Sequence, residues 1–174
     1  VAHLNISSEA SVQNWSTIPK FPHLQFLHIE NIQMQNKTVF KTLESKTCWS
    51  LRFFHSMFVN QESLQYANEI RKNEHLTNLD LQTSTVTLEF LIAILKSRTI
   101  QYLNVWACEI VAPGVHDSRD ALLVLVTPMK ESILSAILAN KVLIEFHWKF
   151  VGLSFLADQM ALSPSEWELI QGHL

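Results

Sequence analysis

Histidine and aspartate are the residues of this sequence that could do chemistry at one shared place. His28, His55 and Asp80 are each the fifth residue of a short apolar segment. If the three segments are neighbouring strands, these side chains form a row that could mimic a two-histidine, one-carboxylate metal site or a base with its orienting group. Strands about 4.8 Å apart, however, place side chains beside one another without making them converge. Since eight histidines make such adjacency common, we expect no metal and no catalysis there, but a binding row that is either pH-sensitive or merely polar.

Other catalytic and cofactor patterns are missing from the sequence. It contains no GxSxG and no Ser-x-x-Lys, and its three glycines are too scattered to form a phosphate-binding loop. Cys48 and Cys108 are too few for a disulfide framework and lack CxxC spacing, which favours a reducing compartment. We therefore expect no cofactor and no enzymatic activity.

Composition sets limits on the class of partner. Hydrophobic residues make up 48% of the chain and charged residues 17%, so a packed core can form. A formal charge of -3 provides no basic field for nucleic acid. The longest apolar stretch, residues 121–126, is far shorter than the roughly 20 residues of a membrane span, and the first residues show neither the basic n-region nor the apolar h-region of a secretory leader. We expect a cytoplasmic or nuclear protein that binds neither nucleic acid nor membrane.

The elements that would position the row come from a repeat. Six segments share the pattern apolar-x-x-apolar-x-apolar, with Ser56 as the one polar exception, and they begin at Val1, Leu24, Leu51, Leu76, Ile100 and Leu143. The steps between these first positions are 23, 27, 25, 24 and 43 residues. Apolar residues at helical spacing follow most segments, as at Leu88, Leu91, Ile92 and Leu95. A strand followed by a helix at a regular interval predicts units that stack.

The best copy of the motif suggests a family. Residues 100–108 follow LxxLxLxxN/C, with Cys108 at the ninth position, and the sequence thereby resembles leucine-rich repeat proteins of the ribonuclease-inhibitor-like, cysteine-containing intracellular type. Ile32, Val59, Ser84 and Val151 depart from the motif at that position. The resemblance implies an α/β leucine-rich-repeat solenoid over residues 1–174, with a curved parallel sheet on the concave face and helices on the convex face. It also implies that Cys108 hydrogen-bonds the backbone of a loop.

Three features describe the organisation of this single domain of about six repeats. The 43-residue step favours an insertion near 111–128 over a decayed repeat, with a short helix or strand at 121–126 and a helix from Pro128. Ser163 and Glu166, with Pro164 between them, predict a capping-box start for a C-terminal capping helix at 163–172. Val1 already lies in a strand segment with no polar cap before it, so we expect the chain to be the C-terminal part of a longer protein whose upstream domains are partners.

The third, fifth and seventh positions of each segment are expected to face the concave side. The ligand-binding candidates on that face are Phe26, His28, Phe53, His55, Met57, Asp80, Tyr102, Asn104, Trp106 and His147. Exposed aromatics among polar groups indicate a surface for a protein or peptide ligand. The alternative is that the aromatics are covered by missing chain, by a second copy or by the long loop that begins at residue 111.

The resemblance implies a protein-recognition module within a larger intracellular receptor or adaptor. Two subclasses fit equally: an innate-immune nucleotide-binding receptor and a ubiquitin-ligase substrate adaptor. The alternative is an extracellular receptor ectodomain with glycans at Asn5, Asn14 and Asn36, each of which begins an N-x-S/T triplet. Asn5 is expected on the concave face, where a glycan would block binding, which argues against that alternative.

Overall fold

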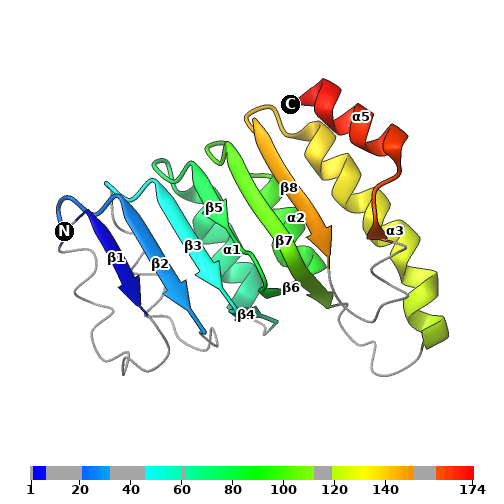
Figure 1. The fold of residues 1–174 in the computed structure, drawn as a ribbon, viewed down its shortest axis with the longest axis horizontal. Helices are drawn as coiled ribbons and strands as arrows, with labels where there is room; N and C mark the ends of the chain where they lie inside the picture. The colour runs from blue at the N-terminus through cyan, green and yellow to red at the C-terminus, as the bar shows by residue number, and fades with distance from the viewer. Residues whose placement is uncertain (1, 7–20, 32–45, 60–61, 112–118, 151–159) are drawn as a thin grey trace.

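The computed structural model describes residues 2–6, 21–31, 46–59, 62–111, 119–150 and 160–174, and it is dominated by one parallel sheet. The strands run in the order β1 (His3–Ile6), β2 (Phe26–Glu30), β3 (Ser50–Phe54), β5 (Asn78–Asp80), β7 (Tyr102–Val111) and β8 (Glu145–Phe150). A second short ladder joins β4 (Met57–Phe58) and β6 (Thr85–Thr87) to the end of β7. In Figure 1 the strands of the main sheet stand side by side, from β1 on the left to β8 on the right.

Helices cover one side of this sheet. They are α1 (Glu62–Lys72), α2 (Leu88–Leu95), α3 (Arg119–Ala139) and α5 (Pro164–His173). In Figure 1, α1 and α2 lie behind the sheet and α3 with α5 lies beside β8. The prediction of an α/β fold with a curled parallel sheet is therefore confirmed. Among the described residues, no helix is long and apolar enough to cross a membrane.

Matching apolar positions of successive strands build the core. The fourth position is occupied by Leu27, Leu51, Leu79 and Leu103, which pair strand by strand and are at most 2% exposed. Parallel strands need helical crossovers, and buried apolar rows on neighbouring strands hold the register. The burial of these rows therefore aligns the side chains on the opposite face.

The third unit begins at Cys48, so the predicted start at Leu51 is wrong by three residues. Leu27 pairs with Leu51, which makes Leu51 a fourth position. Independent evidence comes from the non-glycine residues with positive φ in the described part of the chain, at Asn31, His55, Thr83 and Ala107. Each is the eighth residue of a unit counted from Leu24, Cys48, Leu76 or Ile100. Left-handed conformations are rare for such residues, so their recurrence marks one repeated turn.

This shift overturns three of the predicted concave-face residues. Phe53 stands at the sixth position and is fully buried in the core rather than exposed. His55 lies in the left-handed turn after β3, and Met57, which is 41% exposed, begins β4. The physical reason is that Leu51 satisfies the pattern as either a first or a fourth position. Ser56, a polar residue at a position that the frame from Leu51 assigns to the core, is the feature of the sequence that indicates the wrong frame.

Aromatic rings fill the core behind β3. Phe53 contacts Phe58 edge to face with ring centroids 5.0 Å apart, and Phe58 stacks on Phe90 of α2 at 4.6 Å. Tyr66 of α1 lies 5.9 Å from both Phe53 and Phe58. These geometries are the ones that aromatic pairs favour, and they join β3, β4, α1 and α2 in one cluster.

Polar side chains secure the turn before each of three strands. Asn73, Ser97 and Asn140 each stand three residues ahead of a first core position, and their oxygens accept backbone N–H groups of the residues two and three further on. The Asn140 amide also donates to the carbonyl of Leu95 at 2.7 Å. Such bonds satisfy buried backbone groups that no strand or helix can reach.

The C-terminal third of the structure differs in part from the expected elements. Residues 121–126 and the segment from Pro128 belong to one helix, α3, with Pro128 inside it. Residues 112–118 of the expected insertion lie outside the described residues, so the choice between insertion and decayed repeat stays a prediction. At α5, Ser163 is the N-cap and exchanges both capping-box bonds with Glu166.

Candidate functional site

The helix-free face of the sheet carries a row of polar side chains that we call the central row: Asn5, His28, Arg52, Asp80, Asn104 and His147. Each residue pairs with the next on the neighbouring strand. Four of the predicted site residues, His28, Asp80, Asn104 and His147, are therefore brought together as expected. Arg52 was missed because the misplaced third unit put His55 in its position.

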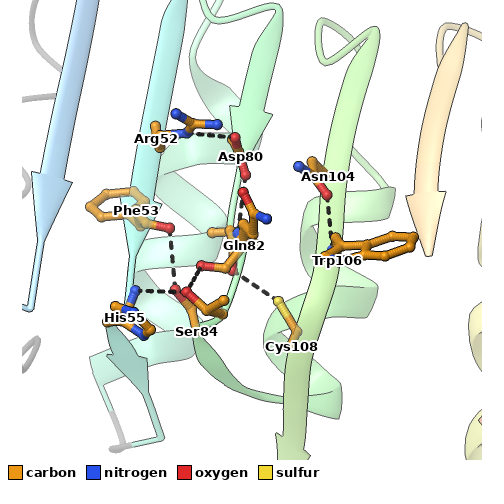
Figure 2. A network of polar contacts seen from close by, with 11 residues as sticks. Arg52, Phe53, His55, Asp80, Gln82, Ser84, Asn104, Trp106 and Cys108 are labelled. Carbon is orange, nitrogen blue, oxygen red and sulfur yellow. Dashed lines mark hydrogen bonds and ion pairs between the residues drawn. The ribbon is translucent and has the colours of Figure 1, made fainter. Parts of the chain in front are cut away.

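An ion pair holds the middle of the central row. Arg52 Nε donates to Asp80 Oδ2 at 2.6 Å, with side-chain exposures of 37% and 13% (Figure 2). The second carboxylate oxygen, Oδ1, accepts the backbone N–H of Gln82 at 3.0 Å. A buried carboxylate needs such partners to stay charged. The pair therefore bridges β3 and β5 while leaving part of the guanidinium open to solvent.

Asn104 repeats the arrangement one strand further on. Its Oδ1 accepts the backbone N–H of Trp106 at 2.9 Å, as Asp80 does for Gln82. The Trp106 side chain is 43% exposed, and Lys149 Nζ lies 4.7 Å from the centroid of its ring. A cation over an indole face is attracted by the ring quadrupole, which holds both side chains in place.

Tyr102 and His147 lie beside this pair. Their ring centroids are 5.5 Å apart, and His147 Nε2 lies 2.7 Å from Glu145 Oε1. Burial raises the pKa of Tyr102, as do the negative charges of Asp80 and Glu145. Tyr102, Trp106, Glu145, His147 and Lys149 thus form a continuous set on β7 and β8, which we call the aromatic patch.

The other end of the central row is built around His28. Its ring lies 6.3 Å from that of Phe54, edge to face, and Phe26 contacts His3 at 5.6 Å. His28 Nε2 is buried without a hydrogen-bond partner. Burial, followed by the positive charge of Arg52, lowers the pKa of His28. This imidazole is therefore held in its neutral form more firmly than an exposed one.

A second polar network lies at the turns that follow β3 and β5. Ser84 Oγ donates to the Phe53 carbonyl and accepts the N–H of Ser56, both at 3.2 Å, and Cys108 Sγ donates to the Leu81 carbonyl at 2.9 Å (Figure 2). Ser56, Ser84 and Cys108 are the ninth residues of their units, so the assignment of Val59 to that position is corrected. The Cys108 contact is the one that the motif predicted for this residue.

Neither cysteine is suited to nucleophilic chemistry. Burial raises the pKa of Cys48 to about 11 and that of Cys108 to about 12. Thiols with such values are protonated near neutral pH, and the thiolate is the reactive form. These residues act as small buried groups that donate to backbone carbonyls.

The structure does not form the three-residue arrangement of His28, His55 and Asp80. His55 lies in the turn after β3, and Arg52 occupies the place between the other two, where its positive charge faces both. The described segments hold no group of three or more metal-ligating side chains. Asn5 lies exposed on β1, whereas Asn14 and Asn36 fall outside the described residues.

Comparison with known proteins finds no matching family model and no matching curated protein. Among solved structures, "Leiomodin-1 Actin-Binding Site 2 (ABS2)" matches with a TM-score of 0.56 at 10% identity, over 91% of this chain and 86% of that one. The two share a fold. The tropomodulin C-terminal domain from Caenorhabditis elegans matches with a TM-score of 0.49 at 14% identity, over 90% of this chain and 93% of that one.

The leiomodin match corrects the family assignment made from residues 100–108. This solved structure with the same fold is a leiomodin domain, not a ribonuclease-inhibitor-like leucine-rich repeat protein, so that assignment is wrong. The match does not support the innate-immune receptor and ubiquitin-ligase adaptor roles that the resemblance implied. At 10% identity the likeness concerns the fold alone.

Proposed function

We propose that this chain is a non-catalytic, protein-binding domain whose binding surface is the helix-free face of the sheet, centred on the aromatic patch. The observation that carries the proposal is the exposed Trp106 ring with Lys149 Nζ 4.7 Å from its centroid, on the strand that also carries Tyr102. Tryptophan and tyrosine are among the residues that contribute most to the binding energy of protein interfaces. Rigid side chains also lose little entropy on binding.

The neighbouring polar side chains would give such an interface its register. Arg52 leaves part of its guanidinium open beside the carboxylate it pairs with, and Glu145 and His147 border the patch. Partly exposed charges around an aromatic centre contribute more to orientation and partner choice than to affinity.

Actin is the partner to test first, because a solved structure with this fold is described as an actin-binding site. This step rests on analogy of fold, whereas the surface rests on the geometry above. An actin partner would also agree with the cytoplasmic location expected from the sequence.

The test measures binding of the purified chain to monomeric actin by anisotropy and to filaments by cosedimentation. Trp106→Ala is expected to weaken binding about tenfold or more, since residues at an interface centre typically contribute about 2 kcal/mol. Trp49→Ala is the matched control, because Trp49 is 44% exposed but lies outside the patch. Absence of binding to either form of actin would reject actin as the partner, and equal effects of the two substitutions would reject the surface.

A further inference from the structure

A groove on the helix side of the molecule forms a second candidate surface, on the other face of the sheet from the central row. It lies among α1, α2 and α3 and has a volume of about 1210 Å³. Its walls are apolar over much of their length, with Leu64, Leu88, Ile92, Ala93 and Ala136 among the lining residues. Leu64 is 43% exposed, so part of this apolar wall is open to solvent.

Charges are segregated along this groove. Glu89 lies in the first turn of α2 and Glu131 on α3 at the same end. Four basic residues line the opposite end, where α1, α2 and α3 terminate: Arg71, Lys96, Arg98 and Lys141. Among the described residues none of these four forms an ion pair. The chain as a whole has a formal charge of -3, so this basic end is a local feature.

Interaction with the helix dipoles explains only part of this arrangement of basic residues beside an apolar wall. Basic residues near helix C-termini are stabilised by the partial negative charge there, by a few tenths of a kcal/mol to about 1 kcal/mol each. That effect does not require an exposed apolar wall beside the charges. An apolar wall that ends in unpaired cations is instead the complement of an amphipathic segment with acidic residues.

We propose that this groove binds an amphipathic helix of a partner protein, with its apolar stripe against Leu64 and Ile92 and its acidic residues against Lys96 and Arg98. The segment of α3 from Pro128 to Ala139 is roughly 17 Å long at about 1.5 Å per residue, so the occupant needs about three helical turns. Its N-terminus lies near Glu89 and Glu131 and its acidic C-terminal half near the basic end. In this orientation, parallel to α2, its own dipole matches the charges at both ends.

The test is a selection from a displayed library of random peptides of about 15 residues, the length of roughly four helical turns. Peptides are selected on the wild-type chain alone, and each selected peptide is then measured on the Lys96→Glu/Arg98→Glu variant. The selected sequences are expected to place leucine or isoleucine at helical spacing with aspartate or glutamate toward the C-terminal half. Each should bind the wild-type chain at least about tenfold more tightly than that variant.

The matched control is the Lys46→Glu/Lys72→Glu variant, which makes the same change in net charge at exposed lysines that do not line the groove. It should bind the peptides as the wild-type chain does. Leu64→Ser should weaken binding about fivefold, because it removes an apolar contact without altering charge. Trp106→Ala should have no effect, which separates this groove from the sheet-face proposal.

Three outcomes would overturn the proposal. One is a selection that yields no acidic enrichment. Another is peptide binding that survives Lys96→Glu/Arg98→Glu or falls equally in the control variant. The last is a selection that enriches no peptide, together with binding of the wild-type chain to vesicles containing phosphatidylserine. The Lys96→Glu/Arg98→Glu variant would not bind these vesicles. That result would make the groove's basic end a lipid-binding site instead.

Discussion

Arg52 Nε and Asp80 Oδ2 lie 2.6 Å apart on neighbouring strands, and this contact joins the two residues that stand between His28 and Asn104 in the central row. Asp80 is the more buried partner and also accepts the backbone N–H of Gln82. The pair thus links two strands side chain to side chain and orders the turn that follows β5.

Removal of the Asp80 carboxylate should destabilise the fold. Asp80→Ala leaves Arg52 unpaired and the Gln82 N–H without its acceptor, so we expect the free energy of unfolding to fall by about 2–3 kcal/mol. Asp80→Asn can keep the Gln82 bond and should cost about half as much. Urea denaturation followed by circular dichroism measures both. Lys72→Ala, which breaks an exposed ion pair with Glu69, serves as the control and should change stability by less than about 0.5 kcal/mol.

His28 should make the fold less stable in acid. Because burial lowers its pKa below the ordinary value of 6.5, the unfolded chain binds a proton more readily than the folded one. Its stabilising contribution is therefore present above pH 6.5 and is lost as the pH falls through the folded value. His28→Gln should show a shallower loss of stability from neutral pH to about pH 5 than the wild-type chain. An NMR titration that placed the His28 pKa above 6.5 would contradict this expectation.

Cys108 should make the fold less stable in alkali. Its pKa is raised from 9.0 to about 12 by burial, so the unfolded chain loses the thiol proton first. The contribution is complete below about pH 9 and declines above it, by about 1.4 kcal/mol for each pH unit between the two values. Between about pH 8 and pH 10, the wild-type chain should lose about 1 kcal/mol more than Cys108→Ser, whose hydroxyl does not titrate there. If the free energy of unfolding fell equally with pH in the two proteins, the raised pKa of Cys108 would be ruled out.

Asn140 should be among the polar side chains that matter most for stability. It is 7% exposed, accepts two backbone N–H groups at 2.8 Å and donates to the Leu95 carbonyl. Asn140→Ala leaves all three groups without a partner and should lower the free energy of unfolding by about 2–3 kcal/mol. Ser97→Ala removes the two accepted backbone bonds of an equivalent turn and a side-chain bond with Thr99, which keeps the Asn73 carbonyl as a partner, and should cost about 1 kcal/mol. Thermal or urea unfolding in which the two variants lose equal stability would show that the Leu95 bond contributes nothing.

Much of the fold could be predicted from local pattern. In the units that contain β2, β5, β7 and β8, the residues at the first, fourth and sixth positions of the motif are buried, and the capping-box residues Ser163 and Glu166 stand where a helix begins. These signals are local because side chains alternate along a strand and helix ends need specific hydrogen-bond partners. The expected upstream domains stay a prediction.

The third unit shows where pattern was insufficient. Leu51 satisfies the motif in two frames three residues apart, and its pairing with Leu27 decides between them. That choice moved Phe53 into the core, placed His55 in a turn and brought Arg52 next to His28 and Asp80. The groove between the helices was missed for a related reason: its basic residues come from the ends of three separate helices and look like ordinary surface charge in the sequence.

By itself, the sequence determined which residues alternate between core and surface and hence that strands and helices alternate along the chain, because burying apolar side chains dominates the free energy of folding. The tertiary structure decided which side chains stand next to one another across strands and helices. Contacts such as Arg52 with Asp80, or Lys149 with Trp106, depend on register between segments far apart in the chain. Register is decided by the packing of the whole sheet, and no single segment contains that information.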